Sequence, residues 1–358
     1  LLCSNDYLGL AAHPRVRNAA AEAATHWGAG AGASRLISGN MQPHERLERR
    51  VAAFKGYESA LLFGSGYLAN SGTISALAGR GEVVFSDELN HASIIDGCRL
   101  SRAETFVYRH ADVEHLAWGL KQAGEHAALI VTDGVFSMDG HVAPLAELVD
   151  LARRHGCRLM VDEAHATGAL GPGGRGSVAA AGLSGEVDVV IGTLGKSLGS
   201  YGAYVCASRE TTDYLLNTAR SFIFSTAPPP PVAAAGLAAL ELLEAQPERV
   251  EKLSANASTL RNALAAEGLE VGTGRSQIVP VEVGDPERTM ELCERILERG
   301  VFAQGIRPPT VPAGTSRLRF TVMSTHRREE LEGAARTVGA AARELGIAGA
   351  AKAHAVAA

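Results

Sequence analysis

One lysine, Lys196, lies in the segment TLGKSLGSYG (193–202), among glycines, small hydroxyl residues and one aromatic residue. A lysine on an ordinary helix surface has an acidic residue three or four positions away, and Lys196 has none. Two interpretations follow. Lys196 is either a solvated side chain in a flexible glycine-rich loop, or a reactive amine whose partner is a bound group that approaches the chain closely.

Other polar side chains follow apolar runs that read as strands. They are His91 in SDELNHASIIDG (86–97), Asp133, Ser137 and Asp139 in TDGVFSMDG (132–140), and Asp162 and His165 in MVDEAHATG (160–168). The Asp-x-x-His spacing of Asp162 and His165 could form half of a metal site, but no second cluster with ligand spacing follows. Taken alone, His91 reads as a polar loop residue.

The segment GSGYLAN (64–70) places Gly64 and Gly66 directly before an apolar helix that is expected to begin near Tyr67. Free N–H groups at a helix N-terminus, reached through glycines, favour an anion such as phosphate. A plain turn explains the same pattern, so this signal is weak by itself. Thr193 could add a hydroxyl to the same anion.

Together these residues predict a pyridoxal phosphate site. Lys196 would form an imine with the cofactor, and Asp162 would face the ring nitrogen. Backbone groups at Gly66 and Tyr67 would bind the phosphate. A nearby carboxylate keeps the ring nitrogen protonated at neutral pH, which makes the ring an electron sink. A lysine whose ammonium form is disfavoured can form the imine and later act as a base.

The middle of the chain supplies the elements that would hold these residues. Apolar runs at 82–87, 104–110, 127–136, 157–165, 187–195 and 202–208 read as strands, and 113–124 and 144–156 read as amphipathic helices between them. Pro144 lies near the start of the second helix and Gly156 at its end. Alternating strands and helices predict an α/β fold with a mostly parallel sheet covered on both faces.

The sequence predicts a large domain over 41–246, after an N-terminal segment (1–40) that we expect to be truncated. The segment SFIFSTAPPPP (221–231) leads into a long helix expected at 232–245. Beyond it, 247–345 reads as a smaller C-terminal α+β domain, with strands at 277–283 and 316–322 and a closing helix from about 327. The remaining residues, 346–358, read as a peripheral tail.

Composition narrows the class of protein. The 358 residues are 46% hydrophobic and 20% charged, with a formal net charge of −5, which gives no sign of a nucleic-acid or membrane partner. The five cysteines are widely spaced and lack a CxxC pair, as in a protein of the reducing cytoplasm without a disulfide framework or a zinc site. No apolar run is long enough for a membrane span.

Motifs along nearly the whole chain resemble those of the α-oxoamine synthases, a branch of the fold-type-I pyridoxal-phosphate enzymes. The matching segments are SNDYLGL (4–10), SRLISGN (34–40), HERLE (44–48), SGYLAN (65–70), NHASIIDG (90–97), DGVFSMDG (133–140), VDEAHATG (161–168), GRGS (174–177), GTLGKSLGSYG (192–202), FSTAPPP (224–230) and IRPPTVPAGTSRLRFTV (306–322). The resemblance departs at two points. The family's N-terminal segment does not precede Leu1, and Asp133 stands where the family often has Glu.

The resemblance implies fold type I, with a seven-stranded sheet, and a role for each matching residue. His91 would stack on the pyridine ring, and His165 and Ser137 would bond its phenolic oxygen. Thr193 would bind the phosphate, and Thr226 the phosphate of the neighbouring subunit's cofactor in a homodimer.

The amino-acid substrate would be held by Asn5 and Arg319. In SRLRFTV, alternate residues share a face, so Arg317 and Arg319 lie together opposite the apolar side chains. Either arginine could bind a carboxylate in a bidentate manner, and two solvated arginines on a surface strand are the alternative.

Within the family, the resemblance of IRPPTVPAGTSRLR (306–319) implies condensation of L-alanine with pimeloyl-CoA or a pimeloyl carrier-protein thioester. The alternatives are another enzyme of the same family that uses glycine or serine with a different acyl-CoA, an aminotransferase, and a non-catalytic regulator. A regulator of this fold would carry a DNA-binding module, and nothing in the sequence resembles one.

Overall fold

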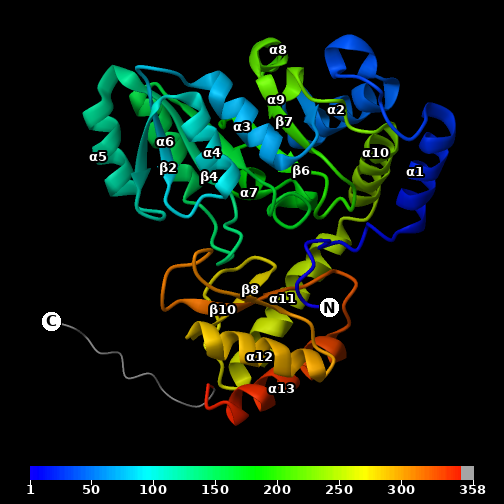
Figure 1. Cartoon of the computed structure of the whole chain (residues 1–358), viewed down its shortest axis with the longest axis vertical. Helices are drawn as coiled ribbons and strands as arrows, with labels where there is room; N and C mark the ends of the chain where they lie inside the picture. The colour runs from blue at the N-terminus through cyan, green and yellow to red at the C-terminus, as the bar shows by residue number, and fades with distance from the viewer. Residues whose placement is uncertain (348–358) are drawn as a thin grey trace. The chain divides into compact units, whose positions relative to one another are not determined.

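The computed structural model describes residues 1–347, and these form two compact units (Figure 1). The larger unit consists of residues 8–137 and 142–250. The smaller unit consists, among the described residues, of 1–7, 138–141 and 251–347. The predicted tail, 346–358, lies outside the described residues from 348 on. Among residues 1–347, no helix combines the length and the apolar character needed to cross a bilayer.

A seven-stranded sheet forms the centre of the larger unit. Its strand order is β1-β7-β6-β5-β4-β2-β3, and all neighbouring pairs are parallel except those that involve β7. This confirms the prediction of a mostly parallel sheet. The strands are β1 (Ser59–Phe63), β2 (Val83–Asp87), β3 (Glu104–Tyr108), β4 (Ala127–Asp133), β5 (Arg158–Asp162), β6 (Val189–Thr193) and β7 (Ala203–Ala207). The sequence reading found six of them and missed β1.

Both faces of the sheet are covered. Successive strand residues point to opposite faces, yet Leu129, Ile130 and Val131 are all 0% exposed. The helices of this unit are α1 (Pro14–Trp27), α2 (Gln42–Lys55), α3 (Gly66–Leu77), α4 (Ala92–Ser101), α5 (Val113–Ala123), α6 (Leu145–His155), α7 (Ser177–Ala180), α8 (Arg209–Thr218), α9 (Arg220–Ile223) and α10 (Pro230–Ala245). Short 3-10 turns at Gly124–His126 and Pro172–Gly174 and a π-turn at Arg35–Gly39 complete it.

Helices α3 and α4 lie side by side on the sheet (Figure 1). Their contact is close because Gly97 of α4 has no side chain. A Cβ atom at that position would lie 2.9 Å from Cδ1 of Ile74 and 3.2 Å from the backbone oxygen of Asn70, both on α3. Both helices start at the edge of the sheet where the parallel strands end, α3 with Ser65 and α4 with His91 as the capping residue.

The smaller unit contains a three-stranded antiparallel sheet in the order β8-β10-β9, with helices beside it. Its elements are α11 (Glu248–Ala266), of which residues 248–250 belong to the larger unit, β8 (Ile278–Gly284), α12 (Pro286–Glu298), β9 (Gln304–Ile306), β10 (Ser316–Thr321) and α13 (Arg328–Glu344). The N-terminal residues extend it, since the Thr321 N–H donates to the Leu2 oxygen at 2.7 Å. An α+β unit with strands near 277–283 and 316–322 was expected, whereas β9, three residues long, was missed.

Candidate active site

The ends of three parallel strands collect the polar residues that the sequence singled out. Asp133 ends β4, Asp162 ends β5 and Thr193 ends β6. In the sheet Asp133 is paired in register with Asp162, and Asp162 with Ile191. Carboxyl ends of parallel strands meet at one edge, which is where open α/β sheets bind ligands.

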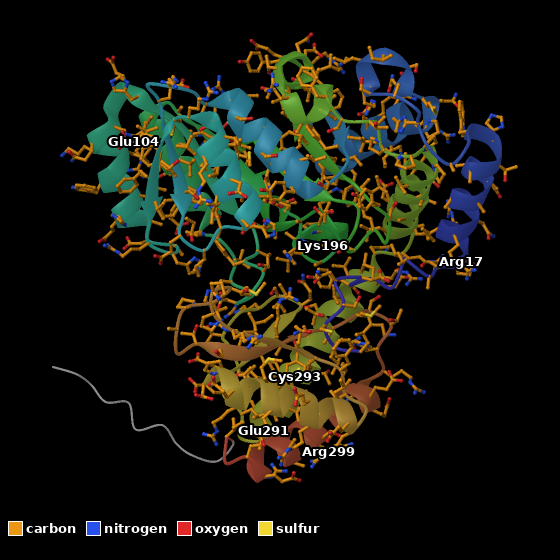
Figure 2. The ribbon with its side chains drawn as sticks, viewed as in Figure 1. Arg17, Glu104, Lys196, Glu291, Cys293 and Arg299 are labelled. Atoms are coloured by element: carbon orange, nitrogen blue, oxygen red, sulfur yellow. The ribbon has the colours of Figure 1, made fainter. Side chains whose placement is uncertain are left out.

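Lys196 lies in the loop that follows β6 in the larger unit (Figure 2). Its Nζ is 2.9 Å from Nε2 of His165, so the structure brings together two of the predicted site residues. His165 is buried, and Lys196 is partly buried. Lys196 is therefore held against a buried imidazole, which contradicts the interpretation of a solvated lysine in a flexible loop.

The loop around Lys196 is tightly folded, which explains its glycines. The Thr193 hydroxyl donates to the Gly202 oxygen at 3.0 Å and accepts from the Gly195 N–H at 3.1 Å. Gly199 has a φ of 56°, and a Cβ there would lie 2.2 Å from the Ala11 nitrogen. Only glycine fits this left-handed, crowded position.

Asp162 is 4% exposed, and both of its carboxylate oxygens are held. Oδ1 accepts the Ala164 N–H at 2.8 Å, and Oδ2 accepts the Asn70 side-chain N–H at 2.6 Å. A carboxylate has about four acceptor positions, so one held in this way can still accept a further donor. Asp162 is therefore a fixed, buried acceptor at the edge of the sheet.

His91 caps α4 at the same edge. Its backbone N–H donates to Asp133 Oδ2 at 2.9 Å. Desolvation by the surrounding protein lowers the pKa of His91; Asp162 raises that pKa and Lys196 lowers it further. Burial, with the nearby Asp162 charge, raises the pKa of Asp133 well above its ordinary value.

The helix N-terminus expected to bind phosphate is formed as predicted, with α3 beginning at Gly66. The Ser65 hydroxyl accepts the Leu68 N–H at 3.2 Å, so the cap uses a later amide than those of Gly66 and Tyr67. The Tyr67 side chain is exposed, and its hydroxyl donates to Asp96. The helix start therefore presents backbone donors and a positive dipole end, which suit an anion.

Of two further predicted residues, Ser137 lies in a turn and Thr226 in an isolated β-bridge. Ser137 follows β4 by four residues and is partly buried. Thr226 is exposed, in a segment that forms an antiparallel bridge with Ser34.

Asn5, Arg317 and Arg319 all belong to the smaller unit. The alternative of two solvated arginines on a surface strand is wrong, because Arg317 is 8% and Arg319 7% exposed. Arg317 forms an ion pair with Asp139 and donates through Nε to the Thr315 oxygen at 2.9 Å. Arg319 instead places Nη2 3.5 Å from Oδ1 of Asn5, the residue with which it was predicted to act.

Tyr7 belongs to the same cluster as Asn5 and Arg319. Its hydroxyl donates to Asn5 Oδ1 at 3.1 Å. Burial raises the pKa of Tyr7, and the charge of Arg319 lowers it. Of the two arginines, Arg317 is thus paired with the Asp139 carboxylate, and Arg319 lies beside Asn5 and Tyr7.

Known proteins resemble this chain over nearly its whole length. A family model described as aminotransferase class I and II matches residues 1–338. An 8-amino-7-oxononanoate synthase from Citrifermentans bemidjiense is 54% identical over 350 residues, which cover 97% of this chain and 90% of the relative. One from Pelobacter propionicus is 55% identical over 351 residues, with the same coverage. The chain belongs to the α-oxoamine synthases, within the class I and II aminotransferase family.

Solved structures of other α-oxoamine synthases share the fold. Serine palmitoyltransferase from S. paucimobilis, solved with bound PLP, superimposes with a TM-score of 0.94 at 37% identity, covering 97% of this chain and 88% of that one. An 8-amino-7-oxononanoate synthase from Francisella tularensis gives a TM-score of 0.83 at 27% identity, covering 97% and 99%. The family's fold-type-I architecture is therefore confirmed.

Sequence reasoning missed three polar residues of the site region. Asn70 and Ser93 connect Asp162 to His91, and Lys55 forms a buried ion pair with Glu163, the residue after Asp162. Asn70 offered a signal, being the one amide on a helix whose other residues are apolar or small, apart from Tyr67. In the part of the chain that the structure describes, no group of three His, Cys, Asp or Glu side chains is arranged for a metal ion.

Proposed function

We propose that this α-oxoamine synthase condenses L-alanine with pimeloyl-CoA, or with a pimeloyl carrier-protein thioester, in biotin biosynthesis. The products are 8-amino-7-oxononanoate, free thiol (CoA or the carrier protein) and CO2. The observation that carries the proposal is the group of relatives, 51–55% identical over at least 93% of this chain, that are named 8-amino-7-oxononanoate synthase.

The cofactor is pyridoxal 5′-phosphate, and the residues at the sheet edge fit it. Asp162, a fixed buried carboxylate, suits a protonated ring nitrogen. The start of α3, at Gly66 and Tyr67, suits the phosphate. The Thr193 hydroxyl would donate to the phosphate in place of the Gly202 oxygen, to which it donates in this structure. His165 and Ser137 would bond the phenolic oxygen. When bound, the cofactor supplies an electron sink that stabilises negative charge at the substrate's α-carbon.

The protein's own groups then perform three tasks. Lys196 takes the α-proton of alanine at Nζ and later returns a proton, with His165 Nε2 2.9 Å away as its hydrogen-bond partner. His91 would cover one face of the ring and would limit the orientation of the substrate. Arg319, with Asn5, binds the alanine carboxylate that leaves as CO2.

We further propose a homodimer in which Thr226 contacts the phosphate at the partner's site. Support comes from the surface around Thr226. Phe224 is 70% exposed, and Ile37, on the segment next to the Ser34 bridge, is 80% exposed. Large exposed apolar side chains of this kind mark interaction surfaces. A cytoplasmic location agrees with the five cysteines, all of which are free thiols.

The test is a substrate panel with the purified protein. L-alanine, glycine and L-serine are each combined with pimeloyl-CoA, acetyl-CoA and palmitoyl-CoA, and thiol release is followed together with product mass. We expect kcat/KM for alanine with pimeloyl-CoA to exceed every other pair by at least about tenfold. A higher value for a different pair would overturn the substrate assignment and leave the family assignment intact.

A second candidate is a serine- or glycine-using member of the same family. The structural comparison favours it, because the TM-score and the identity are higher for serine palmitoyltransferase than for the Francisella tularensis synthase. The alanine assignment instead depends on the relatives above 50% identity. A higher kcat/KM for serine with palmitoyl-CoA than for alanine with pimeloyl-CoA in the substrate panel would support this second candidate.

A further inference from the structure

Four side chains of the larger unit form a continuous line of hydrogen bonds beneath the sheet edge. Asn70 Nδ2 lies 2.6 Å from Asp162 Oδ2 and 2.9 Å from Ser93 Oγ, and Ser93 Oγ lies 2.7 Å from His91 Nδ1. Asn70 and Ser93 are each 1% exposed. The line joins the carboxylate predicted to face the cofactor ring nitrogen to the imidazole predicted to stack on the ring.

The donors and acceptors in this line have one consistent direction. Asn70 must present Nδ2 to Asp162, because the opposite orientation of the amide would place its oxygen 2.6 Å from a carboxylate oxygen. Both hydrogens of Nδ2 are then donated, one to Asp162 and one to Ser93 Oγ. Because the Ser93 hydroxyl accepts from Asn70, its own hydrogen is available for His91 Nδ1.

A second donor points at the same nitrogen. The backbone N–H of Ser93 lies 3.2 Å from His91 Nδ1. An imidazole nitrogen that accepts hydrogen bonds carries no hydrogen, so the ring hydrogen is on Nε2. Protonation of Nδ1 would place a third donor against the Ser93 hydroxyl and the Ser93 N–H.

The amide of Asn70 has an unsatisfied atom. Its Oδ1 is buried and has no hydrogen-bond partner among the described residues. A buried acceptor without a partner is unfavourable, and an apolar side chain at this position would avoid it. The two donated hydrogens are therefore the contribution of this amide.

We propose that Asn70 and Ser93 are positioning residues that fix the carboxylate of Asp162 and hold His91 as the neutral tautomer with hydrogen on Nε2. The role of this tautomer in the reaction rests on the proposed function, in which His91 stacks on a protonated cofactor ring. A neutral imidazole stacks there without repelling a second positive charge, and it keeps an N–H donor on Nε2.

The charged groups around His91 have opposing effects on it. Asp162, at the end of β5, favours the imidazolium, and Lys196, in the loop after β6, disfavours it. Asp133, at the end of β4, contacts the backbone of His91 and has a pKa raised by burial. The two Ser93 donors to Nδ1, the desolvation of the ring and the charge of Lys196 all favour the neutral imidazole of His91. Together they oppose the effect of the nearby Asp162 carboxylate.

The first test observes the tautomer directly in the unmutated full chain. The protein is labelled with ¹⁵N-histidine, and long-range ¹H–¹⁵N correlation spectra are recorded at pH 7.5 with and without bound PLP. His91 is assigned by the signal lost in His91→Gln. We expect Nδ1 to be unprotonated and Nε2 protonated. A hydrogen on Nδ1, or a doubly protonated ring, overturns the proposal without any bearing on the substrate assignment.

The second test removes the donor to His91. Ser93→Ala should raise the pKa of His91 by about half to one pH unit, because one hydrogen bond to the neutral ring is lost. Ser101→Ala is the matched control, since Ser101 is also buried on α4 and its hydroxyl donates only to the Cys98 oxygen, away from His91. An unchanged pKa in Ser93→Ala, or an equal rise in both variants, contradicts the proposal.

The third test concerns Asp162. In the holoenzyme, Asn70→Ala should shift the pH at which the absorption of the bound cofactor titrates, by about half a unit or more. Ser71→Ala is the control, because the neighbouring Ser71 hydroxyl bonds only to backbone oxygens of α3. A titration in Asn70→Ala that coincides with the unmutated protein's would remove Asn70 from this role, whatever amino acid the enzyme uses.

Discussion

Lys55 and Glu163 form an ion pair in the interior of the larger unit, directly behind the active-site edge. Their side chains are 2% and 0% exposed. Glu163 also accepts the Ser177 hydroxyl at 2.9 Å and the Val178 N–H at 2.7 Å. Because Glu163 follows Asp162, this pair anchors the turn that carries both Asp162 and His165.

We predict a large loss of stability for Lys55→Met. The substitution keeps the length of the side chain and leaves the Glu163 carboxylate buried without its cation, which costs about 3–5 kcal/mol for a pair of this burial. The Ser177 hydroxyl and the Val178 N–H still donate to the Glu163 carboxylate in this variant. We therefore expect a loss of stability near the lower end of this range, about 3 kcal/mol. That is a large share of the ~5–15 kcal/mol that usually stabilises a folded protein.

The double variant Lys55→Met/Glu163→Gln provides the internal control. It removes the buried charge as well, so it should be more stable than Lys55→Met alone by about 1–2 kcal/mol. Urea unfolding at pH 7, followed by circular dichroism, measures all three proteins through their midpoints. A loss below about 1 kcal/mol in Lys55→Met, or a double variant less stable than the single one, would refute the reasoning.

Three further predictions concern single residues of the site. Lys196→Ala should lower kcat by at least about 10²–10⁴-fold in the thiol-release assay, and near-normal turnover would remove Lys196 as the base. Arg319→Lys should raise KM for L-alanine by about 10–100-fold, whereas Arg317→Lys, which can keep a charge beside Asp139, should change it little; the reverse result would exchange their roles. The raised pKa of Asp133 means that the native state holds this proton more tightly than the unfolded chain, so stability falls as pH rises from about 4 through the native pKa. Asp133→Asn has no carboxyl group to titrate at this position, so its free energy of unfolding, relative to that of the unmutated protein, should increase between pH 4 and 8 in urea titrations. Parallel pH curves for the two proteins would contradict this prediction.

The regular elements of the larger unit could be predicted because their sequence signals are local. Near-continuous apolar runs such as 127–133 marked strands buried on both faces, and Pro144 and Gly156 marked the ends of α6. The placement of Asp162 and Lys196 at one edge followed from strand direction alone. Strand β1 was missed because its short run SALLF directly precedes the glycine-rich turn and is not separated from it by a helix.

The polar contacts between distant segments could not be predicted. Asn70 and Asp162 are 92 positions apart, and their contact depends on how α3 packs on the sheet. The burial of Arg317 and Arg319 could not be predicted either. The alternation of side chains along a strand predicts that the two arginines share a face, but not which residues cover that face. Arg317 is neutralised by Asp139, which comes from a turn 178 positions earlier in the chain.

In the proposed reaction, Lys196 and its neighbours join alanine to a pimeloyl thioester with loss of the alanine carboxylate as CO2. The most direct measurement supplies L-alanine labelled with ¹³C at the carboxyl carbon together with pimeloyl-CoA, and quantifies labelled CO2, free CoA and 8-amino-7-oxononanoate. We expect all three in equal amounts, and formation of each at least about 10²-fold slower with Lys196→Ala. Thiol release without labelled CO2, or product formation that survives Lys196→Ala at the unmutated rate, would contradict it.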